Sequence, residues 1–390
     1  MIYYKKLHEK VQKRGTYMLA KKPPMGWNSW NTFGANINES LIRETADAMV
    51  ATGLKDAGYE YVVIDDCWSE MQRDSNGKLV ASKEKFPSGM RDLADYIHSK
   101  GLKFGMYSCA GTKTCAGYPS SFDYEFIDAQ TFAEFGIDFL KYDFCYKPAY
   151  ANGPLLYHRM GMALKASGRE ILFSACNWGS DNVGQWIRST GAHMYRSTGD
   201  IIDNPQSFKD IARSQIPLLS MSGPGCYNDI DMLIVGMHNK GNVACGGCTD
   251  DEYEMHFALW CMMASPLMIG CDIRNMDERT FSTLTNKKYI ALDQDEEARP
   301  PFPVGGNLGD SFALFRHLSD NKYALGFFNF TDATSQSIEL FDIGLPNHCG
   351  FGLKLSNMLT GECLGIFTGN VALPIKPHAA TMFDAEIVKL

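Results

Sequence analysis

The chain has 390 residues, of which 45% are hydrophobic and 21% charged, a composition typical of a globular protein with a large buried core. This length exceeds one ordinary domain and suits a barrel followed by a second module. The net charge of −8 argues against nucleic acid or an anionic membrane as a partner, since both require a basic surface.

Residues 1–21 form a basic N-terminal extension in front of the first barrel-like segment. The extension lacks a continuous apolar stretch and a small-residue cleavage site, so we expect no signal peptide. No apolar run of about eighteen residues predicts a membrane helix. Whether residues 1–17 form a short docking helix stays open.

Twelve cysteines are scattered, mostly inside apolar strings, which is the usual setting of buried free thiols. Together with the expected lack of a signal peptide, this predicts a cytoplasmic protein with mostly reduced cysteines. Cys245 and Cys248 form a Cys-x-x-Cys motif without a second pair at metal-binding spacing, so we expect no metal site there.

From about residue 24 to about 298, short apolar β-rich runs alternate with longer helical patterns, as in βαβ units. Eight such units predict a closed (β/α)8 TIM barrel over residues 22–300. The candidate strands lie near Met25–Trp27, Tyr61–Asp65, Lys103–Tyr107, Phe139–Asp143, Ile171–Ala175, Met194–Arg196, Gly225–Asp229 and Leu267–Gly270.

Helix start and stop signals punctuate the segments between these strands. The predicted helices run from Asn38 to Gly53, from Ser88 to Gly101, over 128–135, over 154–167 and, capped by Asp250, over 252–264.

The pattern changes after the proline-rich linker at 300–303. Short alternating segments separated by turn residues follow, which predicts a small antiparallel β-sandwich domain over 301–390. The segments lie at 311–316, 323–329, 337–340, 352–357 and 379–384.

Polar and aromatic side chains stand at the carboxyl ends of the predicted strands, where barrel enzymes have their active sites. Each one alone has a plainer interpretation as a cap, a surface ion pair or a core residue, and only their joint occurrence at one rim points to a site. The candidates are Trp30, Asp65, Asp66, Tyr107, Lys141, Asp143, Asn177, Arg196, Asp200 and Asp231.

A rim rich in acids suits glycoside hydrolysis, which uses two carboxyl groups and requires neither a metal nor a cofactor. We therefore expect a small carbohydrate as the substrate and no cofactor. Barrel hydrolases often dimerise, and a homo-oligomer stays open.

Five strings in order carry a likeness to glycoside hydrolase family 27, the α-galactosidase and α-N-acetylgalactosaminidase family. The likeness is strong over roughly 22–300 and weak beyond. The strings are PMGWNSW at 24–30, IDDCW at 64–68, KTCAG at 113–117, KYDFC at 141–145 and NDIDML at 228–233.

The resemblance implies a retaining glycosidase in which Asp143 is the nucleophile and Asp200 the acid/base, with carboxyl groups about 5–5.5 Å apart. It implies that Asp65 and Asp66 hold O4 and O6 of galactose. Lys141 and Arg196 match hydroxyl ligands, Trp30 the wall of the sugar site, and Tyr107 and Asp231 pocket-lining positions. We further expect the charge of Lys141 to favour ionised Asp143.

The chain departs from the family pattern at three places. Asn177 stands where galactosidases usually carry a Glu that reads the sugar O2. Cys109 replaces a common Asp. Ala35 and Ala192 stand where Cys67 and Cys176 would have their partners, so of the family's disulfides only Cys115–Cys145 can form, which favours a reducing compartment.

Release of terminal α-linked D-galactose is the predicted activity. The alternatives within the family are an α-N-acetylgalactosaminidase, which needs a small residue at 177, and a β-L-arabinopyranosidase, in which the space for C6 is filled. An alternative of another class is a carbohydrate-binding protein without catalysis, which the presence of both Asp143 and Asp200 disfavours.

Overall fold

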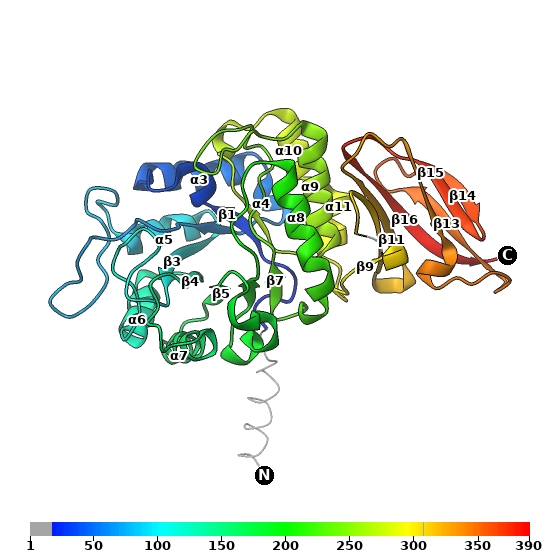
Figure 1. The fold of residues 1–390 in the computed structure, drawn as a ribbon. Helices are drawn as coiled ribbons and strands as arrows, with labels where there is room; N and C mark the ends of the chain where they lie inside the picture. Colours follow the sequence, from blue (N-terminus) through cyan, green and yellow to red (C-terminus); the bar gives the residue numbers. More distant parts are fainter. Residues whose placement is uncertain (1–17, 307) are drawn as a thin grey trace, which may run out of the picture.

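The computed structural model describes residues 18–306 and 308–390 of the chain (Figure 1). It has a barrel of alternating strands and helices and, beside it, a C-terminal domain made of β-strands. The predicted extension at 1–17 lies outside the described residues. In the described part, no helix is long and apolar enough to cross a bilayer.

Eight parallel strands form the barrel sheet, in the order β7-β6-β5-β4-β3-β2-β1-β8. Each lies within two residues of its predicted position at both ends, and almost every residue is buried, as expected where helices cover a parallel sheet. The strands are β1 (Met25–Asn28), β2 (Tyr61–Val63), β3 (Lys103–Cys109), β4 (Phe139–Asp143), β5 (Leu172–Cys176), β6 (Met194–Arg196), β7 (Tyr227–Asp229) and β8 (Leu267–Ile269).

The barrel closes through a residue beyond the end of β7. Leu233 forms a parallel bridge with Ile269 of β8 and exchanges backbone hydrogen bonds with Met268 and Gly270. The chain between Asp229 and Leu233 is therefore fixed at the seam of the barrel. The predicted (β/α)8 architecture is confirmed.

The helices on the outside of the barrel follow the expected alternation, except that two short 3-10 segments, η1 (Ser180–Gln185) and η2 (Ile187–Thr190), connect β5 to β6. The α-helices of the described residues are α2 (Trp30–Phe33), α3 (Glu39–Ala51), α4 (Leu54–Ala57), α5 (Met90–Ser99), α6 (Glu125–Phe135), α7 (Gly153–Ala166), α8 (Pro205–Gln215), α9 (Asp250–Met262), α10 (Glu278–Leu284) and α11 (Lys287–Asp293).

Helix starts follow side-chain capping chemistry. Asn38 caps α3 as predicted, since its side chain accepts a hydrogen bond from the amide of Leu41. The predicted cap of α9 is wrong by one residue. Thr249 is the N-cap and forms a reciprocal capping box with Glu252, while Asp250 lies inside the first turn.

Two other predicted starts are also wrong. Gly89, with φ +81°, is the N-cap of α5, and the amide of Ser88 donates instead to Glu39 on α3. Helix α6 begins at Glu125, three residues before the predicted 128–135. The prediction missed its first turn because Phe126 and Ile127 are apolar but exposed, which obscures the helical period.

The C-terminal domain contains a six-stranded antiparallel sheet and a two-stranded one, in the orders β14-β13-β16-β11-β10-β9 and β12-β15. Buried residues of both sheets share one apolar core, so the predicted sandwich is confirmed. Beyond the five predicted segments the domain has β9, β14 and β15. The strands are β9 (Phe302–Pro303), β10 (Ser311–His317), β11 (Tyr323–Asn329), β12 (Ser335–Glu339), β13 (Phe351–Asn357), β14 (Cys363–Phe367), β15 (Asn370–Pro374) and β16 (Ala379–Lys389).

A buried arginine joins the two domains. Arg316 on β10 has no exposed surface, and its guanidinium donates to the carbonyls of Cys261 and Met262 at the end of α9 and to that of Arg299. These carbonyls are among the last of the helix, which have no partner within it. Apolar residues of β10, β11 and β16 extend the core of the barrel itself.

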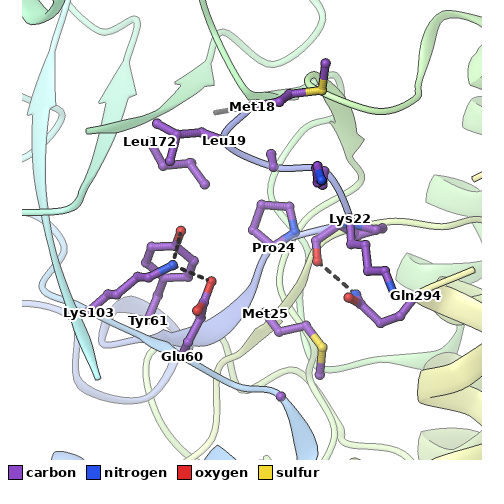
Figure 2. Close-up of a pocket in the computed structure, with 14 residues that line it drawn as sticks. Met18, Leu19, Lys22, Pro24, Met25, Glu60, Tyr61, Lys103, Leu172 and Gln294 are labelled. Atoms are coloured by element: carbon purple, nitrogen blue, oxygen red, sulfur yellow. Dashed lines mark hydrogen bonds and ion pairs between the residues drawn. The ribbon is translucent and has the colours of Figure 1, made fainter. Parts of the chain in front are cut away.

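A cavity of about 630 Å³ lies at the amino ends of the strands (Figure 2). The ammonium of Lys103 lies 2.8 Å from a carboxylate oxygen of Glu60, and the Gln294 side chain donates to the carbonyl of Pro23. In barrels this end serves stability, and active sites lie at the opposite end, where the strands terminate.

Candidate active site

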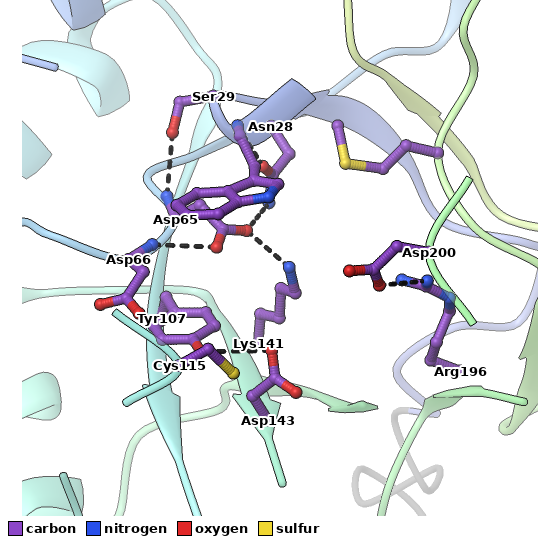
Figure 3. Close-up of polar contacts among 12 residues, drawn as sticks. Asn28, Ser29, Asp65, Asp66, Tyr107, Cys115, Lys141, Asp143, Arg196 and Asp200 are labelled. Carbon is purple, nitrogen blue, oxygen red and sulfur yellow. Dashed lines mark hydrogen bonds and ion pairs between the residues drawn. The ribbon is translucent and has the colours of Figure 1, made fainter. Parts of the chain in front are cut away.

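The predicted site residues on the strands meet at one rim because all eight strands are parallel and end at the same side of the sheet. Asp65 and Asp66 follow β2, Tyr107 lies near the end of β3, and Lys141 and Asp143 end β4. Arg196 ends β6, and Asp200 and Asp231 follow β6 and β7. Figure 3 shows the side chains of Asp65, Lys141, Asp143 and Asp200 facing a common space.

Asp65 is the centre of a hydrogen-bond network. Its Oδ2 accepts from Lys141 Nζ at 2.7 Å and from Asn28 Nδ2 at 2.8 Å, and its Oδ1 accepts from the amide of Asp66. The amide of Asp65 itself donates to Ser29 Oγ. Asp65 is buried, so this network fixes its carboxylate in one orientation.

Asp66 is held by the backbone. Its Oδ1 accepts from the amide of Cys67, and its Oδ2 accepts from the amide of Ala116, 2.9 Å away on the loop after β3. Burial raises the pKa of this carboxyl, and the two amides oppose that shift. The orientation of Asp66 thus depends on the position of the loop that carries Ala116.

Asp143 ends β4 with both oxygens hydrogen-bonded. The amide of Phe144 donates to Oδ1 at 2.9 Å. The Tyr107 hydroxyl donates to Oδ2 at 3.2 Å (Figure 3). Burial raises the pKa of the Tyr107 phenol, which keeps its proton available for this bond. Burial also raises the pKa of Asp143 to about 6, and the positive charge of Lys141 opposes that rise without cancelling it.

Arg196 links two acids through one nitrogen. Its Nη2 lies 2.7 Å from Oδ1 of Asp200 and 2.6 Å from Oδ2 of Asp231. Arg196 and Asp231 are buried, whereas the Asp200 side chain is 71% exposed. Of the two acids, only Asp200 is therefore open to solvent and to an incoming substrate.

Both carboxylate oxygens of Asp231 accept hydrogen bonds from the protein. Its Oδ1 accepts from the amide of Met232, and its Oδ2 accepts from the amide of Ile201 at 2.6 Å as well as from Arg196. Burial raises the pKa of Asp231 to about 6, against the effect of Arg196. Trp260 on α9 donates its indole N–H to the backbone carbonyl of Asp231, where φ is +85°.

For Trp30 and Asn177, the hydrogen bonds below are to Asn28 and to the backbone of Ser180 rather than to the acids of the rim. Trp30 is half-buried on α2, and its amide donates to the side chain of Asn28. Asn177 is fully buried after β5, and its Nδ2 donates to the carbonyl of Ser180. Within 18–306 and 308–390, the Oδ1 of Asn177 has no hydrogen-bond partner.

The structure joins Cys115 and Cys145 in a disulfide, the pairing that the resemblance implied. The bridge ties the loop after β3 to the loop after β4, and both sulfurs lie within 4.8 Å of a carboxylate oxygen of Asp143. Among the described residues these three are the one group with metal-ligand spacing, but disulfide sulfurs are not thiolate ligands. Ten cysteines are free, including Cys67 and Cys176.

Three residues that the sequence interpretation did not assign also belong to the site. Asn28 donates to Asp65, the half-buried Asp229 lies beside Arg196, and Trp260 supports Asp231. Asn28 and Asp229 line a cavity of about 20 Å³ at the floor of the site, together with Lys141, Cys176 and Arg196. Asn28 is the last residue of β1 and Asp229 the last residue of β7. This position at a strand end could have identified both from the sequence.

Comparison with known proteins gives a consistent picture. The sequence profile described as "Alpha galactosidase A" matches residues 22–295. An α-galactosidase from Cyamopsis tetragonoloba is 42% identical over 367 residues, which cover 94% of this chain and 86% of that protein. Alpha-galactosidase A from Cellvibrio japonicus is 45% identical over 80% of this chain and 77% of its own.

Solved structures share the fold over nearly the whole chain. Alpha-galactosidase I from Mortierella vinacea superimposes with a TM-score of 0.87 and 34% identity, over 94% of this chain and 97% of the other. A β-L-arabinopyranosidase from Geobacillus stearothermophilus superimposes with a TM-score of 0.82 and 25% identity, over 94% and 97%.

Proposed function

The chain belongs to glycoside hydrolase family 27 and is a galactose-releasing glycosidase, and on that premise we propose that it works by a retaining double displacement in which Asp143 and Asp200 carry the chemistry. The observation that carries the proposal is the placement of these two acids at one rim. Asp143 is buried and fixed by two hydrogen bonds, and Asp200 is open to solvent.

In the first step, a carboxylate oxygen of Asp143 attacks the anomeric carbon and forms a glycosyl ester. The bond from that carbon to the leaving oxygen breaks, and Asp200 gives this oxygen its proton. The hydrogen bonds from Tyr107 and Phe144 aim the attacking carboxylate, and Lys141 favours its charged form.

In the second step, water attacks the same carbon from the side that the leaving group vacated. Asp200, now ionised, takes a proton from this water, and Asp143 leaves as a carboxylate. Because Asp200 is largely exposed, water reaches it once the leaving group has departed. Two inversions at one carbon give retention.

We assign the hydroxyl contacts of the sugar to the hydrogen-bond network around Asp65. The carboxylates of Asp65 and Asp66 accept from O4 and O6, and Lys141 and Arg196 donate to further ring hydroxyls. Trp30 supplies an apolar wall. Asp231 lines the pocket, and its bonds to Arg196 and to the amide of Ile201 position that arginine and the loop that carries Asp200.

The first experiment compares kcat/KM on nitrophenyl α-galactoside, α-N-acetylgalactosaminide and β-L-arabinopyranoside. We expect the galactoside to lead, since Asp65 and Asp66 leave the space for C6 open. The arabinopyranosidase among the structural relatives is the reason to include the third substrate. If one of the other two glycosides has the highest kcat/KM, the assignment of Asp143 and Asp200 stands, but galactose is not the preferred sugar.

The second experiment assigns the two acids. Asp143→Ala with azide should restore turnover of an activated aryl galactoside and give β-galactosyl azide, because azide then takes the place of the nucleophile. Asp200→Ala with azide should give the α-azide, because the ester still forms. The same anomer from both variants would contradict the assignment.

A cytoplasmic location is also part of the proposal. It is supported by the ten free cysteines, and the Cys115–Cys145 bridge is the feature that speaks against it. Titration of thiols in protein isolated under acid quench tests it: ten free thiols mean that the bridge is closed in the cell, and twelve mean that it is open.

A further inference from the structure

The loop between β4 and α7 carries an aromatic residue that the proposed chemistry does not use. Tyr146 follows the nucleophile by three positions, and its side chain is 59% exposed. A large aromatic residue exposed at the rim of an active site has an unused apolar face.

Tyr146 is held in an unfavourable backbone conformation. Its φ is +49°, in the left-handed region that bulky side chains rarely adopt. Such conformations persist only where the surroundings determine them, and they are concentrated at active sites and ligand clamps.

Three contacts fix the loop in this conformation. The preceding residue, Cys145, is bonded to Cys115. Both the amide and the hydroxyl of Thr112 donate to the carbonyl of Tyr146, at 3.2 and 3.3 Å. Gly111 packs so closely that a side chain there would collide with the backbone of Cys145 and Tyr146.

The remainder of the loop is also ordered by contacts. Lys147 places its ammonium 5.4 Å from the centre of the buried Phe144 ring and donates to the carbonyl of Ala151 at 3.0 Å. Tyr146 is therefore presented on a rigid support, so little conformational freedom is lost when a ligand binds to it.

The position of Tyr146 relative to the nucleophile limits what it can touch. The sulfur of Cys145 lies within 4.8 Å of a carboxylate oxygen of Asp143, and consecutive Cα atoms are about 3.8 Å apart. Tyr146 therefore belongs to the loop that borders the nucleophile, one residue beyond the disulfide, and it is not part of the network of Asp65, Lys141 and Arg196 that we assign to galactose.

We propose that Tyr146 is part of a leaving-group subsite and packs its ring against the pyranose ring to which galactose is linked. This rests on the proposed glycosidase function and adds a residue that contacts the leaving group. The apolar C–H face of a pyranose is the chemical complement of an exposed aromatic face.

The test uses two galactosyl donors that differ only in the leaving group. In α-galactosyl fluoride it is fluoride, which offers nothing to stack, and in the disaccharide melibiose it is glucose. For both, kcat/KM reports the steps up to cleavage of the bond to the leaving group. The readout is the ratio of the melibiose value to the fluoride value.

We expect Tyr146→Ala to lower this ratio about tenfold, and Tyr146→Trp to preserve or raise it. Tyr146→Asn removes the ring with a residue that tolerates φ above zero, so it separates loss of the ring from backbone disturbance. The matched control is Tyr150→Ala, an 82% exposed tyrosine on the same loop, which should change the ratio less than twofold.

An unchanged ratio in the Ala and Asn variants overturns the proposal and leaves Tyr146 to another role, such as contact with a partner protein. An equal fall in Tyr150→Ala also overturns it, because the effect would then belong to the loop. If the wild-type chain cleaves neither donor, the proposed function itself has failed.

Discussion

Lys141 on β4 places its ammonium 2.7 Å from Oδ2 of Asp65, which follows β2, so the hydrogen bond spans the mouth of the barrel across the intervening strand β3. Its effect on Asp143, two residues along β4, acts through space. The sequence predicted that Lys141 would favour ionised Asp143. It does so, but burial outweighs it, and the pKa of Asp143 is about 6 rather than the ordinary value near 4.

This pKa predicts an acid limb in the pH profile. A nucleophile must be ionised in the free enzyme, so kcat/KM on an aryl galactoside should fall tenfold per pH unit below about 6. Lys141→Met removes the charge that opposes the rise, and the limb should move to higher pH. Lys103→Met, which removes a lysine paired with Glu60 at the opposite end of the barrel, is the control. If the acid limb of Lys141→Met stays at the wild-type pH, the limb does not report the ionisation of Asp143.

Arg196 should be essential to both stability and catalysis. Arg196→Met leaves Asp231 as a buried acid without its cation, which costs roughly 3–5 kcal/mol at neutral pH. The loss of the cation raises the pKa of Asp231 further, so the penalty is present above that pKa and disappears as the pH falls and Asp231 is protonated.

The measurement is the difference in thermal midpoint between wild type and variant at pH 8 and at pH 5, which should be clearly larger at pH 8. Arg279→Met is a matched control. Arg279 also bridges two acids, Asp251 and Glu254, but it is half exposed, and its loss should cost at most about 1 kcal/mol. Equal losses at both pH values would contradict the account.

Reduction of the Cys115–Cys145 bridge should weaken substrate binding more than turnover. The bridge holds the loop whose Ala116 amide orients Asp66, the residue that we assign to a sugar hydroxyl. We expect KM for an aryl galactoside to rise about five- to tenfold after treatment with a phosphine reductant. A double Cys115→Ser, Cys145→Ser variant should show the same KM without reductant. Cys363→Ser, at an exposed free cysteine, should leave it unchanged.

Asn177 can be tested through its orphaned oxygen. If Oδ1 accepts a hydrogen bond from the 2-hydroxyl of galactose, Asn177→Ala should lower kcat/KM about tenfold on the galactoside and little on the 2-deoxygalactoside. The Nδ2 bond to Ser180 predicts a small loss of stability in the same variant. An equal loss on both sugars would make Asn177 a structural residue.

The barrel was predicted well because the same alternation of a short apolar strand and a longer helical segment is repeated along the sequence. Each strand is a short apolar run between turn residues, and all eight candidates lie within two residues of the observed strands. The errors were local. Ser88 and Asp250 are good capping residues by type. The amide of Ser88 is taken by Glu39 on another helix, a contact that a single sequence does not show, whereas the Thr249-x-x-Glu252 capping box was readable in the sequence and was missed.

The sequence predicted which side chains stand at the rim of the barrel, but not which of them form hydrogen bonds and ion pairs with one another. Parallel strands bring Asp65, Lys141 and Asp143 together by topology alone. That Arg196 bridges Asp200 and Asp231 depends on where the loop after β7 returns to the barrel, which is fixed by the bridge of Leu233 to Ile269. Long-range closure of this kind leaves no periodic trace in the sequence.

The C-terminal end of helix α9 contacts both the active site and the C-terminal domain. Arg316 of the C-terminal domain donates to the carbonyls of Cys261 and Met262, and the residue just before them, Trp260, supports Asp231. Deleting the C-terminal domain would strip the cover from those carbonyls and from the apolar residues beneath them. A protein cut at the linker would therefore be a poor starting point for engineering, and the whole chain from the first strand to the last is the smallest catalytic unit worth expressing.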